Sequence, residues 1–348
     1  MSDYPTNIAF GIDIGGSGIK GAPVDLLTGE FFAPRYRIAT PQPATPQAVA
    51  DTVAELVGHF NLDASIPIGI DFPAPIIHGV APMIANLDKS WTGVDVRRLM
   101  RDRLGRSVTV VNDADAAGYA EVHYGAAEDR KGLVMVVTLG TGIGTVLVMN
   151  GTLIPNTELG HLEINGHDAE SKAATSAFER EKLSYERWAR RLQRYFSHVE
   201  MLFSPDVFII GGGISKKADK FVPLLSTRAP IIPAELLNSA GIVGSALMAA
   251  QEDGVFDLTP EVRAQIRSNR DRIRAEARAR STSPLSEQPD LAYGIPAGET
   301  RADKAAAKKS EKAAAKKAAK AAKKAAKAER KSSKDAKKAT QRRVGKRD

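Results

Sequence analysis

The sequence predicts an α/β protein with two lobes of similar design, followed by a charged helix with a linker and a basic tail. Three observations predict this fold class. Apolar runs rich in β-branched residues alternate with segments of helical spacing between residues 1 and 256. A strand, a glycine-rich turn, a second strand and a glycine-containing hairpin follow one another in each half of that region. Residues 301–348 are mostly alanine and lysine, a composition that cannot bury a hydrophobic core.

The first lobe is expected to span residues 1–110. Short runs of apolar and β-branched residues bounded by turns predict its strands, and apolar residues spaced three and four apart predict its helices. The predicted strands are 8–14, 19–27, 30–37, 66–72 and 107–111, and the predicted helices are 47–60 and 94–104.

The second lobe is expected to span residues 111–256 and to repeat the opening of the first. A charged helix and a linker are expected at 257–300, ahead of the disordered, Lys/Ala-rich tail at 301–348. The predicted strands of the second lobe are 133–139, 145–149 and 207–210, and its predicted helices are 114–124, 184–203 and 244–251.

Charge is distributed unevenly along the chain. Residues 301–348 hold 20 basic and 5 acidic residues, whereas residues 1–300 hold 29 basic and 36 acidic ones. An acidic body of net charge −7 therefore carries a tail of net charge +15. Any affinity for nucleic acid that the basic composition suggests belongs to the tail alone.

The chain has no cysteine, which excludes disulfides, zinc–thiolate sites, iron–sulfur clusters and a cysteine nucleophile. The same absence fits a reducing cytoplasm, where we expect the protein. No apolar run approaches the roughly 18 residues that a membrane span requires. The first ten residues include an acid and lack the basic start of a signal peptide, so none is expected.

The most informative segment is the octet at 13–20, Asp-Ile-Gly-Gly-Ser-Gly-Ile-Lys. It also fits the G-x-G-x-x-G pattern of dinucleotide sites, but that pattern needs a helix at the loop, and here a second strand is predicted. A turn of small residues between strands lets backbone N–H groups approach phosphate oxygens. Lys20 adds a positive charge, and Asp13 can orient a hydrated Mg²⁺. The residues of this turn expected to bind phosphate are Gly15, Gly16, Ser17 and Gly18.

Two further glycine turns follow predicted strands of the second lobe. Alone, each is more simply a tight turn than a ligand site. Together, in this order and at strand ends, the three turns match the two phosphate motifs and the adenosine motif of actin-like sugar kinases. The second turn consists of Gly140, Thr141 and Gly142, and the third consists of Gly211, Gly212 and Gly213.

Within that superfamily the chain resembles the ROK (repressor, ORF, kinase) family. The segments DIGGSGIK at 13–20, NDADAA at 112–117, LGTGIG at 139–144 and ELGHLE at 158–163 carry the resemblance, which covers about residues 1–255. The segments NLDKSWTG at 86–93 and NTELGHLEINGHDAE at 156–170 are similar to the polyphosphate glucokinase group of actinobacteria. The resemblance implies a two-lobed actin-like (ribonuclease-H-like) sugar kinase fold, a glucokinase that uses polyphosphate or ATP with Mg²⁺, and a homodimer.

The resemblance assigns the catalytic base to Asp113, which would accept the proton of the sugar 6-hydroxyl as that oxygen attacks phosphorus. From the residues alone, Asn112 and Asp113 could instead cap the helix predicted at 114–124, a role that Asp115 could fill equally well. The implied sugar-binding residues are Asn86, Asn112, Asp113, Glu158, His161 and Glu170. For the last of these, Glu163 or Glu179 could take the place of Glu170.

One departure from the family pattern concerns zinc. Many ROK proteins bind zinc through cysteine and histidine after an E-x-G-H motif. Here Glu158 to His161 form the motif, but no cysteine follows, and His161 alone would hold zinc poorly. The polyphosphate glucokinase group implies this zinc-less pattern.

Three alternatives remain open at this stage. The basic face of residues 187–194 is either an ordinary solvated helix face or a contact surface for long polyphosphate, a role for which Lys216 and Lys217 compete. The enzyme could be an ATP-only hexokinase acting on glucose or mannose. The tail resembles the tails of linker histones, so it could bind nucleic acid or other polyanions without base selection.

Overall fold

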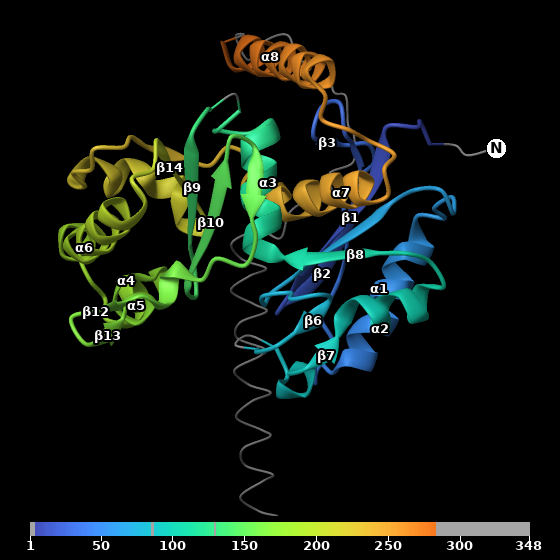
Figure 1. Cartoon of the computed structure of the whole chain (residues 1–348), viewed down its shortest axis with the longest axis horizontal. Helices are drawn as coiled ribbons and strands as arrows, with labels where there is room; N and C mark the ends of the chain where they lie inside the picture. Colours follow the sequence, from blue (N-terminus) through green and yellow to red (C-terminus); the bar gives the residue numbers. More distant parts are fainter. Residues whose placement is uncertain (1–3, 85–86, 129, 283–348) are drawn as a thin grey trace, which may run out of the picture. The chain divides into compact units, whose positions relative to one another are not determined.

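Two mixed sheets of matching topology organise the structure, a computed structural model that describes residues 4–84, 87–128 and 130–282 (Figure 1). The first has the strand order β3-β2-β1-β5-β8, with β4 also paired to β2, and the second has the order β11-β10-β9-β14-β15. In each, an antiparallel meander leads into parallel strands. The predicted repeat and the α/β fold class are confirmed. Asn86, most of the linker and the tail lie outside the described residues.

The elements are as follows. The first sheet comprises β1 (Ile8–Gly15), β2 (Gly18–Asp25), β3 (Glu30–Phe31), β4 (Tyr36–Ile38), β5 (Ile68–Phe72) and β8 (Thr109–Asn112). The second comprises β9 (Leu133–Leu139), β10 (Ile143–Met149), β11 (Thr152–Ile154), β14 (Val207–Gly211) and β15 (Ile231–Pro233). Two-stranded sheets pair β6 (Val80–Ala81) with β7 (Val94–Asp95), and β12 (Glu163–Ile164) with β13 (His167–Asp168). The helices are α1 (Pro46–His59), α2 (Val96–Leu104), α3 (Asp113–Tyr124), α4 (Ala169–Ala173), α5 (Thr175–Arg180), α6 (Tyr185–Phe203), α7 (Ala240–Glu252) and α8 (Pro260–Thr282).

Alternation along β1 divides its side chains between two layers. Phe10, Ile12 and Ile14 are buried in the cluster that includes α1 and α2. On the opposite face, Gly11 lies directly against α7, where a Cβ would overlap the carbonyl oxygen of Ile242. Only glycine lets the helix backbone approach the strand this closely.

The second sheet is built in the same way, and two helices join it to the first. The odd-numbered residues of β9 pack with α6, and the even-numbered ones pack in the layer of α3. Helices α3 and α7 pack against each other between the two sheets, with α7 on β1 and β5 and α3 on β10 (Figure 1). The start of α3 is therefore held where both sheets meet.

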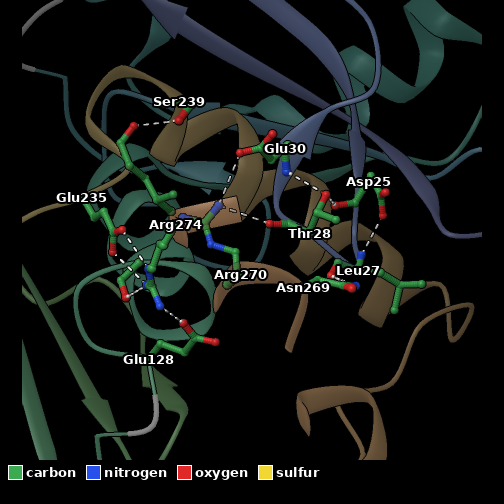
Figure 2. A network of polar contacts seen from close by, with 12 residues as sticks. Asp25, Leu27, Thr28, Glu30, Glu128, Glu235, Ser239, Asn269, Arg270 and Arg274 are labelled. Carbon is green, nitrogen blue, oxygen red and sulfur yellow. Dashed lines mark hydrogen bonds and ion pairs between the residues drawn. The ribbon is translucent and has the colours of Figure 1, made fainter. Parts of the chain in front are cut away.

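Helix α8, which lies beyond the region of family resemblance, packs onto the body through apolar and polar side chains, and Figure 2 shows part of the polar network. Ile266 is buried in the cluster of α3 and α7. Asn269 donates to the carbonyl oxygen of Leu27, and Arg270 lies 3.7 Å from Glu30. Arg274 forms ion pairs with Glu128 and Glu235, each at 2.8 Å, which Figure 2 draws as dashed lines.

The differences from the predicted elements are local. The strand predicted at 30–37 is split into β3 and β4, because Pro34 between them has no N–H to donate to a ladder. The helix predicted at 244–251 begins four residues earlier, at Ala240. Residues 159–180, for which the sequence predicts no regular element, form a 3₁₀ turn, the β12–β13 pair, α4 and α5. No helix in the described ranges combines the length and apolar character needed to cross a bilayer.

Candidate active site

Three aspartates gather at the carboxyl ends of neighbouring parallel strands in the first sheet. Asp13 in β1 is in register with Asp71 in β5, and Asp113 directly follows β8, the next strand. Asp71 is buried, and within the described chain neither of its carboxylate oxygens makes a well-formed hydrogen bond. Burial raises the pKa of Asp71 well above its usual value, and the charges of Asp13 and Asp113 raise it further. This edge of the sheet concentrates negative charge that a cation could offset.

The first glycine turn, between β1 and β2, has two cations beside it. Ser17 is exposed at its tip. Lys20 lies 2.6 Å from Asp13, which pairs the predicted phosphate contact with the predicted Mg²⁺-orienting carboxylate. Arg37 lies opposite Lys20 in the β2–β4 pairing and donates to the carbonyl oxygen of Ser17 at 2.6 Å. Nothing in the local sequence marks Arg37, because only the pairing of β4 with β2 brings it to the turn.

Asp113 is the first residue of α3, and its neighbour Asn112 caps the helix. The side-chain oxygen of Asn112 accepts from the N–H groups of Ala114 and Asp115 at 2.9 and 3.1 Å. The cap is therefore neither Asp113 nor Asp115, although Asp113 also accepts from the N–H of Ala114. Since the Asn112 oxygen is engaged, only its amide nitrogen remains to meet a sugar hydroxyl.

The carboxylate of Asp113 is reached by solvent, although protein surrounds it closely. Burial raises its pKa to about 6, with the charges of Asp13 and Glu158 adding to the rise. A carboxylate of this pKa is mostly ionised at neutral pH and is a stronger base than an ordinary aspartate. The side chain thus has the properties of a general base, between the acids of the first sheet and Glu158 of the second lobe.

Asp115, one residue further into α3, fixes the segment that leads to Glu158. Its side chain is buried and accepts from the backbone N–H of Asn156 at 2.7 Å. Burial raises the pKa of Asp115 to about 7, with Glu158 and Asp113 contributing. The sequence carried a signal for this role, because Asp115 lies in the acidic NDAD motif on the buried side of the helix.

The predicted sugar ligands of the second lobe lie together around His161. His161 donates from Nδ1 to Asp168 at 2.8 Å, and its ring lies 4.0 Å from both Glu158 and Glu170. The bond to Asp168 raises the pKa of His161, and burial raises that of Glu158. Glu163, Glu170 and Glu179 are the three candidates for the last sugar-binding residue. Of these, Glu170 has a carboxylate oxygen 4.0 Å from the ring of His161.

Glu170 also reaches the second glycine turn. Its Oε2 accepts from the N–H of Ile143 at 3.0 Å, and a Cβ on Gly142 would overlap its carboxylate. The N–H and hydroxyl of Ser176 donate to the carbonyl oxygens of Gly140 and Thr141 at 3.1 and 2.6 Å. The turn is thus fixed by α4 and α5, neither of which the sequence predicts.

The third glycine turn lies beside the second, because β9 and β14 are parallel neighbours. Gly211 is in register with Thr138, and a Cβ on Gly212 would overlap the backbone of Leu139. Gly213 faces open space. The second and third turns therefore lie side by side at the ends of these two strands.

Oxygen and nitrogen atoms of His161, Asp168 and Glu170 lie within 4.8 Å of one another, close enough for a shared metal ion. His161 is hydrogen-bonded to Asp168, Glu170 accepts from the N–H of Ile143, and the three groups are one ligand short of a structural zinc site.

Comparisons with known proteins identify a matching family model and several similar proteins. The model of the ROK family matches residues 9–177. The polyphosphate glucokinase of Mycobacterium tuberculosis is 51% identical over 244 residues, which cover 70% of this chain and 91% of that protein. The polyphosphate glucokinase of Mycobacterium leprae is 48% identical, covering 70% of this chain and 75% of that protein. The solved inorganic polyphosphate/ATP-glucomannokinase of Arthrobacter sp. strain KM is 54% identical, with a TM-score of 0.67, covering 70% of this chain and 99% of that one.

Proposed function

The chain belongs to the ROK family, and on that basis we propose that it is a glucokinase that transfers a phosphoryl group from inorganic polyphosphate or ATP to the 6-hydroxyl of glucose. The observation that carries the proposal is the position of Asp113. Its carboxylate, with a pKa of about 6, is close enough to be affected by the charges of Asp13, before the first glycine turn, and of Glu158. Glu158 belongs to the group of side chains around His161, called here the sugar cluster: Glu158, His161, Asp168 and Glu170. The named activities of the mycobacterial relatives supply the donor and the sugar.

Asp113 would take the proton that the sugar hydroxyl loses as its oxygen attacks phosphorus. Glu158, His161 and Glu170 would hold the other hydroxyls, since carboxylates accept and the imidazole donates or accepts. Asp115 would act through Asn156 by keeping Glu158 in place. The glycine turns would hold donor phosphates through backbone N–H groups, with the charges of Lys20 and Arg37 at the first turn.

Mg²⁺ fits the acidic edge of the first sheet. Asp71 is buried without a well-formed hydrogen bond beside Asp13, and a nearby cation would favour its ionised form and offset the charge of Asp13. Asp13, whose side chain is one quarter exposed, would hold the ion through water. When bound, the ion supplies positive charge to the phosphoryl oxygens.

The test is an activity matrix of two donors against three sugars. Purified protein is assayed with ATP or long-chain polyphosphate against glucose, mannose and fructose, with Asp113→Asn as the blank. We expect glucose 6-phosphate from both donors. A polyphosphate rate equal to the blank, with ATP active, would favour the ATP-only hexokinase instead.

The proposal extends to the organisation of the molecule. The two sheets fall almost wholly within the proposed lobes at 1–110 and 111–256, although α7 of the second range packs on β1 and β5 of the first. Helix α8 supports a charged helix at the start of 257–300. We propose that the protein is a homodimer, as the family resemblance implies. Analytical ultracentrifugation, which measures the mass of the protein in solution, tests this. A cytoplasmic location suits the substrates and the absence of cysteine.

A further inference from the structure

A second basic site lies in the second lobe, away from the residues assigned above. It is a cavity of about 260 Å³ between the β12–β13 pair, α4 and α6. Four basic side chains line it and no acidic one does. They are His167, Lys172, Arg191 and Arg194.

Two of these cations are available for a ligand. Arg191 is held by an ion pair with Glu181 at 2.5 Å and by a bond to the carbonyl oxygen of Lys172. The side chains of Lys172 and Arg194 are exposed, and neither forms an ion pair within the described part of the chain. Arg191 is therefore fixed in position, whereas Lys172 and Arg194 can turn toward an anion.

The cavity shares a helix with the active site. Helix α4 places Glu170 at His161 and at the second glycine turn, while Ala169, Lys172 and Ala173 line the cavity from the same helix. Residues within three positions of Glu170 on this short helix thus line the basic cavity. A ligand that reaches both must extend past the reacting phosphate.

We propose that this cavity binds internal phosphates of a long polyphosphate chain, a subsite that ATP does not use. The inference rests on the proposed function, in which polyphosphate is a donor. Several cations in a cavity that no acidic side chain lines suit a repeating anion. A nucleotide base would find no open aromatic face, because Tyr195 is 1% exposed.

The test compares two double variants of equal charge change. Lys172→Ala with Arg194→Ala removes the two available cations of the cavity. Arg187→Ala with Arg190→Ala removes two exposed cations of α6 that do not line it. For the cavity variant we expect a KM for long-chain polyphosphate about 5- to 20-fold higher at low salt. Its KM for ATP and its kcat should match those of the wild type, and the α6 control should resemble the wild type with both donors.

Chain length gives a second readout, because a longer chain has more phosphates that can reach the cavity, so the difference in KM between the cavity variant and the wild type should be larger for long-chain polyphosphate than for tripolyphosphate. If the double variant fails to fold, Arg194→Gln alone and direct binding of long-chain polyphosphate replace it. An unchanged KM, or an equal rise in both double variants, would overturn the subsite while leaving the kinase assignment intact. A wild-type protein that turns over ATP but no polyphosphate would instead overturn the donor assignment, and the subsite with it.

Discussion

At the scale of single residues, the cap of α3 decides what Asp113 can do. Because Asn112 takes the N–H groups of Ala114 and Asp115, the helix does not depend on the Asp113 carboxylate for its start. That carboxylate lies at the helix N-terminus, which favours its ionised form, while burial and two neighbouring acids oppose ionisation. Burial and the neighbouring acids have the larger effect, so the pKa of Asp113 rises to about 6.

Replacing Asp113 by asparagine keeps the shape of the side chain and removes its ability to accept a proton. We expect kcat to fall by about 100-fold or more. The KM for glucose should change little, because Glu158, His161 and Glu170 remain. Steady-state kinetics with both donors measure this, and thermal unfolding checks the fold. Near-normal turnover would show that Asp113 is not the general base and that its role is structural.

The pKa of Asp113 also predicts the pH dependence of the reaction. A general base must be ionised, so activity is expected to rise as pH increases through about 6 and to fall as the carboxylate is protonated below it. The profile of kcat/KM for glucose measures this ionisation in the free enzyme. Residual activity of Asp113→Asn should lack this limb. Persistence of the limb in the variant would assign it to another group, such as a donor phosphate.

The sequence identifies residues within motifs more readily than residues that reach the site through tertiary structure. Asp13, Asp113, Glu158 and His161 lie in recognisable segments at strand ends or beside glycine. Asp71 was detectable as an acid inside the apolar run at 66–72, since a buried carboxylate usually has a function. Arg37 was not, because its place depends on the β2–β4 pairing.

At the scale of elements, the second glycine turn is held from one side and open on the other. Glu170 and Ser176 fix its backbone, whereas a Cβ on Gly140 would meet no protein atom within 4 Å. The open side is where donor phosphate is expected to approach. A side chain added at Gly140 would therefore obstruct the donor without disturbing the packing.

Gly140→Val tests this arrangement. We expect loss of most activity with both ATP and polyphosphate, because both present a phosphate at the same turn. Thermal unfolding should be nearly unchanged, and Gly140→Ala should give an intermediate loss as the graded control. Loss with ATP alone would show that polyphosphate bypasses the turn.

The long helices can be predicted from the periodicity of their apolar residues, whereas the short elements around the sugar cluster cannot. Helices such as α1 and α6 have apolar residues at helical spacing over three or more turns. Helices α4 and α5 have five and six residues, too few to show a period. The β12–β13 turn did carry a signal, since Asn165 and Gly166 both have positive φ, as a two-residue hairpin turn requires.

At the scale of the whole molecule, α8 joins parts of the body that are far apart in sequence. Its contacts reach the β2–β3 turn at Thr28, the end of α3 at Gly125 and the loop after β15 at Glu235 (Figure 2). The guanidinium of Arg274 lowers the pKa of Glu235, so the pair stabilises the ionised carboxylate in the folded protein. That contribution is present at neutral pH and is lost as pH falls through the lowered pKa.

Arg274→Ala should destabilise the protein, because it leaves Glu128, largely buried, without this ion pair. We expect a loss of about 1–3 kcal/mol in the free energy of unfolding. Denaturant unfolding at neutral pH measures it, with Arg272→Ala, an exposed arginine on the same helix, as the control. Equal stabilities of the two variants would mean that Ile266, rather than the ion pairs, holds α8.

The last prediction concerns residues 301–348, whose net charge of +15 contrasts with −7 in the remainder of the chain. Encounter of polyphosphate with an acidic body is electrostatically unfavourable, and a basic segment on the same chain raises the local concentration of the polyanion. Deleting 301–348 should leave kcat with ATP unchanged and raise the KM for long-chain polyphosphate at low salt. The difference should shrink as salt screens the charges.

A tail of equal length with its Lys and Arg replaced by Gln separates charge from length, and it should behave like the deletion. Because the tail acts on encounter and the α4–α6 cavity on the bound chain, the two effects on KM should multiply when the deletion is combined with Lys172→Ala and Arg194→Ala. If KM for polyphosphate at low salt is the same with and without the tail, the tail is a spectator in catalysis. Retention of the full-length protein on DNA, lost on deletion, would then assign the charges to nucleic acid or another cellular polyanion.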